Sequence, residues 1–470
     1  MTQEIEAKLE KCESCEYVGV DVTREVTVDK EGKRKEGNLL CPICYADGKA
    51  VKERLKNHSV PATLTDVKAT FQKWLYLDGD TEVIDVFLAC SIDRLLPGDP
   101  IWLLFISPSG GSKTEIVRSN TTSLAYTLDS LTAHTLVSGK MQRNAEGTQE
   151  PVTGILKEID GKVLIIKDLT VILTKRQEER DEIFSQLRCL YDGYLEYGFG
   201  TLDKPIRIPA SIGLVAAVTP SVDQYSKMYV QLGERFLKIR HSPDGEKATA
   251  KAMSNLGKEE EMRLDLSSVV DRFLRLLPRN KIENASEQQL RYIQKLAHAT
   301  AILRTPVSIN FWRYEVNSAL TPNVEYPTRL SKQLLKLTYA LAMVRGKTVV
   351  DSYDLKTVQR VARDTTYPNR IRILKAMKDK NESYSTRQVA DLSDIPLSSC
   401  WRELKELEYL NVVKYEKYEE YANTYANSKR HEPEKDGWQL RNETLNVLWI
   451  DLPETILSKS VSLNPSEANM

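Results

Sequence analysis

The sequence lacks both a net charge and a long apolar run. Its 470 residues contain 66 Lys and Arg against 66 Asp and Glu, so no global attraction to nucleic acid is expected. The longest apolar run, residues 101–106, is far shorter than the ~18 residues that a membrane-spanning helix needs. The first 15 residues are charged throughout and have no apolar core, unlike a secretory signal. We therefore expect a cytoplasmic protein with no membrane partner.

What the sequence does contain is an ordinary globular composition, with 41% hydrophobic and 28% charged residues. Its length predicts about three domains. Apolar segments at 101–106, 163–166 and 212–218 alternate with predicted helices, which is typical of a parallel α/β sheet. After about residue 250 the pattern becomes mainly helical, with predicted helices at 286–304, 326–346 and 351–362.

A loop rich in Gly and Ser, SPSGGSKT at 107–114, follows the most apolar strand and precedes a predicted helix at 114–123. It resembles the phosphate-loop pattern G-x-x-x-x-G-K-[ST], with Ser107 and Ser112 in the two formal glycine positions. The loop would present backbone N–H groups to phosphate oxygens, while Lys113 would reach the β- and γ-phosphates and Thr114 would bind Mg²⁺. The alternative is a turn that happens to precede a helix. The predicted nucleotide-binding residues here are Gly110, Gly111, Ser112, Lys113 and Thr114.

Polar residues also follow the next two predicted strands. Asp168 comes after the strand at 163–166, where an ATPase needs an acid to orient Mg²⁺ or to activate the attacking water. Lys167 precedes it in the place where a first acid is usual, and Asp168 could alternatively cap the turn that follows. Thr219 ends the strand at 212–218 and is a candidate γ-phosphate sensor. Arg235 lies beyond it as a candidate finger for the nucleotide of a neighbouring subunit.

The order of these segments along the chain is similar to that of a known family. Residues 61–365 resemble the AAA+ core of minichromosome maintenance-type helicases and their relatives in phages and mobile elements. The similar stretches are SPSGGSKTE, GKVLIIKDLT, SIGLVAAVTP, LGERF, PTRLSKQLLKLTYALA and VVDSYDL. The resemblance implies an ATP- and Mg²⁺-dependent ATPase that forms a hexamer-type ring on DNA. It also implies that Arg235 is the finger and that Arg329, in the helical lid, is a second sensor at a subunit boundary.

Four of the seven cysteines form two C-x₂-C pairs. Four thiolates on two short turns are the ligands that tetrahedral Zn²⁺ prefers, and the segment between the pairs alternates like a β-hairpin. The pattern predicts a zinc ribbon, although redox pairs or chance spacing are alternatives. The predicted ligands are Cys12, Cys15, Cys41 and Cys44. We expect the other three cysteines, Cys90, Cys189 and Cys400, to be buried small hydrophobes.

The C-terminal region is predicted to be a winged helix. Three helices at 369–378, 385–390 and 397–407 precede two strands at 412–416 and 437–440, an order typical of major-groove readers and of some protein-docking modules. Ser398, Ser399, Arg402 and Lys405 are expected on the exposed face of the third helix.

The predicted organisation is therefore multidomain. It comprises a zinc ribbon (1–60), an α/β P-loop AAA+ core (61–280), a helical lid (281–365), a winged helix (366–450) and a flexible tail (451–470). The expected function is that of an ATP-hydrolysing DNA helicase or translocase of a phage or mobile element. Two alternatives stay open. One is a replication initiator or loader that does not translocate and whose assembly nucleotide controls. The other is a DNA-binding regulator with a vestigial ATPase fold.

Overall fold

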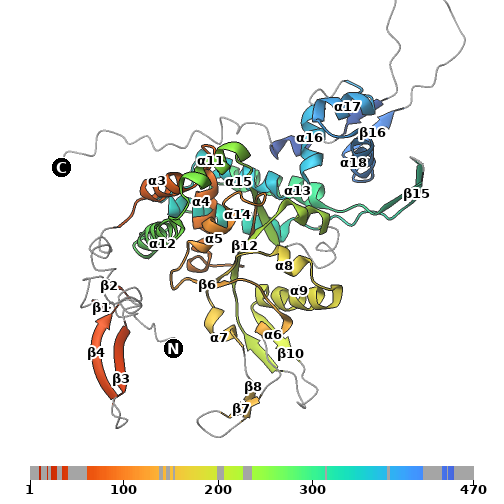
Figure 1. Ribbon diagram of the computed structural model, residues 1–470. Helices are drawn as coiled ribbons and strands as arrows, with labels where there is room; N and C mark the ends of the chain where they lie inside the picture. The colour runs from red at the N-terminus through yellow and green to blue at the C-terminus, as the bar shows by residue number, and fades with distance from the viewer. Residues whose placement is uncertain are drawn as a thin grey trace, which may run out of the picture.

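A five-stranded parallel sheet lies at the centre of the computed structural model (Figure 1). The structure describes residues 61–136, 141–143, 149–151, 154–197, 206–225, 235–312, 315–377, 382–416, 437–441 and 443–448, together with the backbone of 10–11, 18–19, 23–28 and 34–40. The strand order is β13-β5-β12-β9-β6. The strands are β5 (Trp102–Ile106), β6 (Ala125–Leu128), β9 (Val163–Ile166), β12 (Gly213–Val218) and β13 (Phe236–Arg240).

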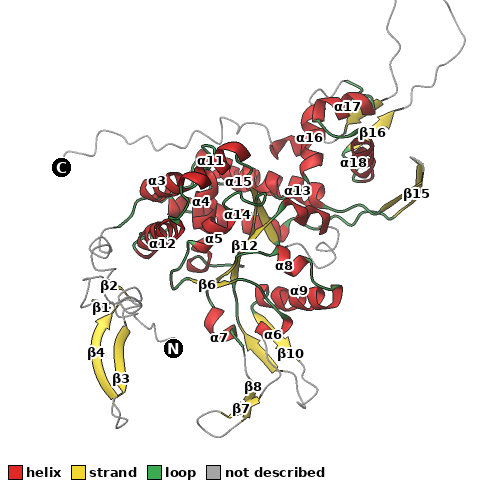
Figure 2. Cartoon of the chain, in the orientation of Figure 1, coloured by secondary structure: helices red, strands yellow, loops and turns green. Residues whose placement is uncertain are grey.

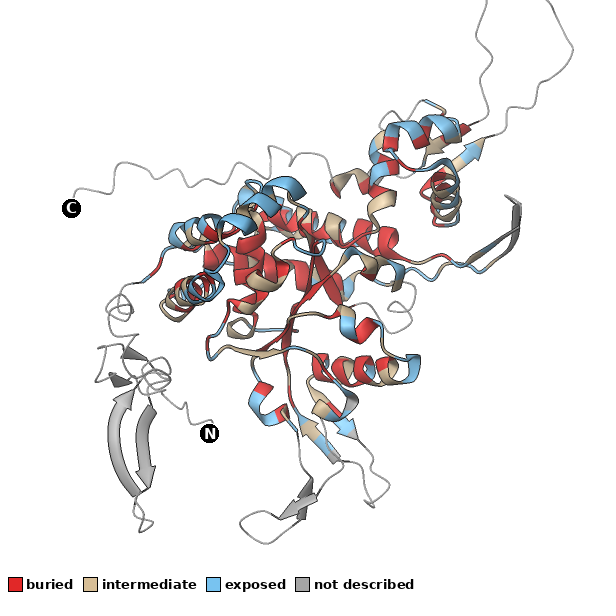
Figure 3. Cartoon of the chain, in the orientation of Figure 1, coloured by how far each residue is buried: buried red, intermediate tan, exposed pale blue. Residues whose placement is uncertain are grey.

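Both faces of this sheet are covered, which explains why β5, β9 and β12 are continuous apolar runs (Figures 2 and 3). Leu103 and Phe105 face one hydrophobic layer, and Trp102, Leu104 and Ile106 face the other. The first layer contains α3 (Leu64–Trp74), α4 (Glu82–Ser91) and α5 (Lys113–Arg118), whereas the second contains α7 (Leu156–Ile159), α8 (Thr170–Leu173) and α9 (Gln177–Tyr191). Burial of each large apolar side chain in β5 contributes about 1.5–3 kcal/mol.

Helix α5 is shorter than the predicted helix at 114–123, because it ends at Arg118. The Ser119 hydroxyl donates to the Ile116 carbonyl, and the Asn120 side chain accepts hydrogen bonds from both the N–H and the hydroxyl of Thr122. Such side-chain bonds to nearby backbone compete with helix formation. The chain then turns into β6, an edge strand that the sequence pattern did not reveal.

A helical region follows the sheet. Its helices are α11 (Gly245–Ser254), α12 (Glu259–Arg275), α13 (Glu287–Arg304), α14 (Thr328–Val344) and α15 (Ser352–Asp364). The last three confirm the helices predicted at 286–304, 326–346 and 351–362. Capping boxes begin α13 at Ser286 and α15 at Asp351. Helices α11 and α12 were not predicted, and α12 packs against α3.

Beyond residue 366, three helices precede an antiparallel pair of strands, as the sequence predicts. The helices are α16 (Pro368–Ala376), α17 (Thr386–Ser393) and α18 (Leu397–Tyr409), and the strands are β16 (Val413–Glu416) and β17 (Gly437–Leu440). Arg370 joins this region to α13. Its guanidinium is buried and donates to the carbonyls of Leu303 and Thr305 and to the carboxylates of Glu403 and Glu406.

The remaining elements are short helices and hairpins. Two of the hairpins are inserted in the chain between strands of the sheet (Figure 1): β7 (Met141–Arg143) with β8 (Gln149–Pro151), and β10 (Tyr194–Tyr197) with β11 (Ile206–Pro209). The others are α6 (Ala133–Leu136), β14 (Ile309–Trp312) with β15 (Glu315–Ala319), and the 3-10 helices η1 (Asp93–Leu95), η2 (Pro220–Tyr225) and η3 (Glu443–Leu448).

Among the N-terminal residues, β1 (Glu10–Lys11) pairs with β2 (Val18–Gly19), and β3 (Thr23–Val28) pairs antiparallel with β4 (Arg34–Leu40). The β3–β4 pairing confirms the hairpin predicted between the two cysteine pairs. Cys12, Cys15, Cys41 and Cys44 lie outside the described residues, as does the predicted tail at 451–470. In the part of the chain that is described, no helix has both the length and the apolar content to cross a bilayer.

Candidate nucleotide-binding site

The loop between β5 and α5 is left-handed at its second formal glycine position, although a serine occupies that position. Ser112 is left-handed, with φ of 64°, and Gly110 has φ of +79°. Ser107 is fully buried, and its hydroxyl donates to the Gly111 carbonyl at 3.1 Å. A Cβ atom at Gly111 would lie 2.1 Å from the Ser107 hydroxyl, so a larger residue at position 111 would displace that hydroxyl from its hydrogen bond. Ser107, which departs from the sequence pattern, therefore connects the two ends of the loop through its hydroxyl.

Lys113 and Asp168 follow the carboxyl ends of β5 and β9, close enough for the Asp168 charge to act on Lys113. The Lys113 ammonium is nearly buried and donates to the Pro108 carbonyl inside the loop at 3.2 Å. Burial lowers the pKa of Lys113, and the nearby Asp168 carboxylate opposes that shift. One oxygen of Asp168 also accepts the Thr170 N–H at 2.9 Å, so the residue caps the following turn as well as facing Lys113. Thr114 follows Lys113 in the first turn of α5.

Strand β12 lies between β5 and β9 and brings Thr219 to the same edge of the sheet. The Thr219 hydroxyl lies 2.6 Å from that of Ser221. Lys167 has a different neighbour, because its ammonium pairs with Asp129 beyond the end of β6 at 2.6 Å. The lysine that occupies the usual place of an acid therefore pairs with a carboxylate on the β6 side of the sheet, whereas Asp168 acts on the charge of Lys113.

A cavity of about 320 Å³ opens over the loop, a size within the range of small-ligand sites. Gly110, Ser112, Lys113 and Thr114 line one side of it. The segment from Trp74 to Tyr76 and residues of α11 and α12 line the other side. Asn255, at the end of α11, donates to the Trp74 carbonyl at 2.8 Å and holds these two parts together. Sequence reasoning missed this wall because no local motif marks it.

The two candidate arginines lie together but away from Lys113. The Arg235 and Arg329 guanidinium carbons lie 5.2 and 5.9 Å from the centroid of the Tyr191 ring. Tyr191 packs edge-on against Trp102, the first residue of β5, so this cluster is at the amino end of the strand whose carboxyl end leads to Lys113. Roughly 13 Å of strand separates the two ends. Arg235 is buried and pairs with Asp192 at 3.0 Å.

Charged residues connect the carboxyl edge of the sheet to α15. Arg240, at the end of β13, makes two 2.8 Å hydrogen bonds to Asp223, and its backbone N–H donates to Asp364. Next to it, Arg360 binds the Asp80 carboxylate at 2.5 and 2.6 Å. Burial raises the pKa of Asp80, but hydrogen bonds from Arg360 and His241 outweigh it and bring that pKa to about 2.

No protein-family model and no curated protein matches this sequence.

Residues of α18 that were expected to face solvent divide into two groups. Ser398 and Arg402 are exposed, as predicted, and Ser399 is half-buried. Lys405 is instead held at the surface, because its ammonium pairs with Glu408 at 2.8 Å and lies 5.1 Å from the centroid of the Trp438 ring. The side chain of Lys405 therefore supports the β16–β17 hairpin.

Proposed function

We propose that the chain binds ATP with Mg²⁺ in the cavity above the loop at 107–114 and hydrolyses it while acting on DNA. The observation that carries the proposal is that Lys113, with the Asp168 charge near it at the carboxyl edge of a parallel sheet, lines a cavity of about 320 Å³. Ligands of open α/β sheets bind at this edge. The left-handed Ser112 and the close packing of Gly111 on Ser107 fit a loop whose backbone must approach phosphate oxygens closely.

Each residue at this edge then has a role. Lys113 would leave the Pro108 carbonyl for the β- and γ-phosphates, Thr114 would hold Mg²⁺, and Asp168 would orient the metal or the attacking water. Bound Mg²⁺ supplies charge neutralisation as the terminal phosphate departs. Thr219 would sense that phosphate. The wall at Trp74–Tyr76 offers apolar and aromatic surface to the base.

The position of the two arginines supports head-to-tail assembly of identical chains. Arg235 and Arg329 lie at the opposite edge of the sheet from Lys113, so they can reach a nucleotide only in a neighbouring subunit. A heterologous contact of this kind forms a ring when the rotation closes. We therefore infer a ring of hexamer type. Arg235 would exchange Asp192 for a phosphate on assembly.

DNA as the substrate is inferred from the resemblance to minichromosome maintenance-type AAA+ helicases and from the C-terminal region. The order α16, α17, α18, β16, β17 fits a winged helix, with Ser398 and Arg402 on the exposed side of α18. A helicase or translocase of a phage or mobile element fits these features best. A replication initiator or loader that does not translocate is the second candidate, because β9 is followed by one acid, Asp168, and by Lys167, which pairs with Asp129 in the usual place of the other acid.

A single assay tests the proposal: ATP binding and ATP turnover, with and without DNA, by the wild-type chain and by Lys113→Ala. The matched control is Lys295→Ala, at an exposed position on α13. We expect nucleotide affinity in the wild type and in the control, DNA-stimulated turnover with strand separation, and loss of both in Lys113→Ala. Binding with negligible turnover would favour the loader. No nucleotide affinity in any variant would leave only a DNA-binding regulator with a vestigial fold.

The zinc ribbon stays a prediction from the two cysteine pairs, to which the β3–β4 hairpin adds the expected connection. We expect about one Zn²⁺ per chain in the purified protein, lost in Cys12→Ser. The control is Cys189→Ser, which removes a half-buried thiol elsewhere. A protein purified without metal, or one whose metal survives Cys12→Ser, would refute the ribbon.

A further inference from the structure

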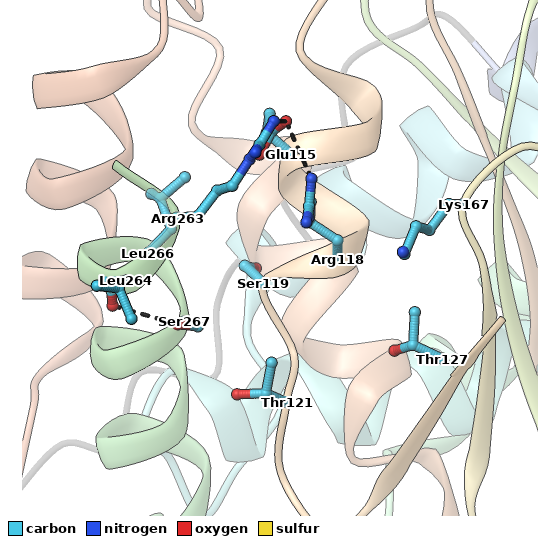
Figure 4. Close-up of a pocket in the computed structure, with 10 residues that line it drawn as sticks. All are labelled: Glu115, Arg118, Ser119, Thr121, Thr127, Lys167, Arg263, Leu264, Leu266 and Ser267. Atoms are coloured by element: carbon cyan, nitrogen blue, oxygen red, sulfur yellow. Dashed lines mark hydrogen bonds and ion pairs between the residues drawn. The ribbon is translucent and has the colours of Figure 1, made fainter. Parts of the chain in front are cut away.

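A second cavity, also of about 320 Å³, lies beside α5 and contains neither Lys113 nor Thr114 (Figure 4). Its walls are α5 and the turn after it, the carboxyl ends of β6 and β9, and α12. Glu115 lines both this cavity and the one above the loop, so the two lie side by side along α5. The function proposed for Lys113 does not account for this second cavity.

The charges around the cavity favour an anionic ligand. Arg118, Lys167 and Arg263 line it against a single carboxylate, that of Glu115, although the whole chain is electrically neutral. Figure 4 shows the two guanidinium groups and the ammonium distributed around one opening. Arginine and lysine surrounded by hydroxyl groups are typical partners of phosphate oxygens, and four Ser and Thr side chains complete the polar part of the wall.

The partners that these cations now have are weak ones. Arg263 contacts Glu115 at 3.3 and 3.4 Å and Arg118 contacts it at 3.5 Å, whereas strong charge-assisted hydrogen bonds are about 2.7–2.9 Å long. Lys167 makes a short contact of 2.6 Å with Asp129, but the Asp129 side chain is 82% exposed, and exposed pairs contribute only about 0–1 kcal/mol whatever their length. A phosphate group can therefore recruit all three cations without breaking a strong contact.

The rest of the wall is apolar. It is contributed by Leu264 and Leu266 of α12. A bare anion would leave this surface in water, whereas a ligand with both a phosphate and an organic body would cover it. A cavity of about 320 Å³ is large enough for such a molecule.

We propose that this cavity binds a small phosphorylated molecule, of the class of a nucleoside monophosphate, through Arg118, Lys167 and Arg263. The proposal does not depend on nucleotide binding at Lys113. A nucleoside monophosphate lacks the β- and γ-phosphates that a phosphate-loop lysine reaches, so the two sites can be distinguished with one ligand.

The test is equilibrium dialysis of the full chain with radiolabelled AMP, in the presence of saturating ADP and Mg²⁺. We expect one AMP per chain, with affinity reduced by about tenfold or more in the double variant Arg118→Gln, Lys167→Gln, since each lost charge-assisted contact weakens binding. Lys113→Ala and the control Lys295→Gln should bind AMP as the wild type does. Lys167→Arg should retain binding because it keeps the charge.

Three results would overturn the proposal. They are no AMP binding by the wild type at millimolar concentration, equal binding by wild type and the double variant, or loss of binding in Lys113→Ala alone. The last result would place AMP at the loop. Arg118 and Lys167 are both partly exposed, so we expect the double variant to fold, and its thermal unfolding midpoint measured beside that of Lys167→Arg checks this.

Discussion

Arg235 and Arg329 flank the same aromatic ring, that of Tyr191, although one precedes β13 and the other begins α14. Burial raises the pKa of the Tyr191 hydroxyl, so the ring stays neutral beside two cations. Because Tyr191 packs on the first residue of β5, the two arginines lie at the amino end of that strand, whereas Lys113 follows its carboxyl end. One chain thus carries the two halves of the proposed nucleotide site on opposite edges.

That separation predicts complementation between two inactive variants. Lys113→Ala removes one half of the site and Arg235→Ala the other, so each variant alone should lose ATP turnover. In a random equal mixture, about a quarter of head-to-tail junctions join an intact loop to an intact arginine. We expect turnover of the mixture to recover toward that fraction, measured by phosphate release. A mixture no more active than its components would mean that the arginine acts in its own subunit or not at all.

Ser112 offers a test of the loop itself. A left-handed backbone is unfavourable by about 1–2 kcal/mol for a residue with a Cβ atom. Glycine removes that penalty, but part of the gain is offset because glycine loses more conformational entropy on folding. We expect Ser112→Gly to raise the free energy of unfolding by about 0.5–1 kcal/mol, measured by urea denaturation. Ser109→Gly is the control, because Ser109 in the same loop does not have a positive φ, and this variant should be neutral or destabilised. Destabilisation by Ser112→Gly would contradict the inference that the backbone at Ser112 is strained.

The junction between α13 and the C-terminal helices depends on Arg370. Replacing it with Ala leaves the carboxylates of Glu403 and Glu406 and the carbonyls of Leu303 and Thr305 without this partner. Removing one side of a buried ion pair is unfavourable by about 3–5 kcal/mol, and we expect a loss of that size in urea unfolding. Arg372→Ala, at an exposed position on the same helix, should change stability by less than about 0.5 kcal/mol. Similar losses in both variants would argue against this role.

The parts of the fold that the sequence predicts correctly are those with strong local signals. The apolar runs of β5, β9 and β12 were recognisable because both faces of the sheet are covered. Strands β6 and β13 were missed because β6 is only half-buried and Lys238, itself buried, interrupts β13. Helix α12 did carry a usable signal: its buried residues recur at helical spacing. Among the cysteines expected to be buried, Cys90 and Cys400 are, while Cys189 is only half-buried.

In the candidate site too, the residues with a local sequence signal could be predicted and the others could not. Lys113, Thr114 and Asp168 follow strands directly, so their meeting at one edge follows from the parallel topology. The far wall of the cavity could not be predicted in this way, because the Asn255 side chain and the Trp74 carbonyl that join there are 181 residues apart in the sequence. Likewise, the resemblance indicates Arg235 and Arg329 one by one, but their shared ring belongs to a third segment. Contacts between distant segments depend on how the helices pack, which a single sequence does not specify.

Asp80 makes the stability of the chain depend on pH in the acid range. Its pKa of about 2 in the folded protein lies below the ordinary value of 3.8, so the ionised form is favoured by folding. This contribution is complete above about pH 4 and is lost as the pH falls toward 2. Asp80 is partly exposed, so solvent screening limits it to about 1 kcal/mol.

Asp80→Asn should therefore reduce the free energy of unfolding at pH 6 and flatten its decline between pH 4 and 2, measured by urea unfolding at a series of pH values. Asp78→Asn removes the same charge from the same turn without touching Arg360, and is the matched control. An unchanged acid slope in Asp80→Asn would mean that the Arg360 and His241 contacts do not hold the carboxylate in its ionised form.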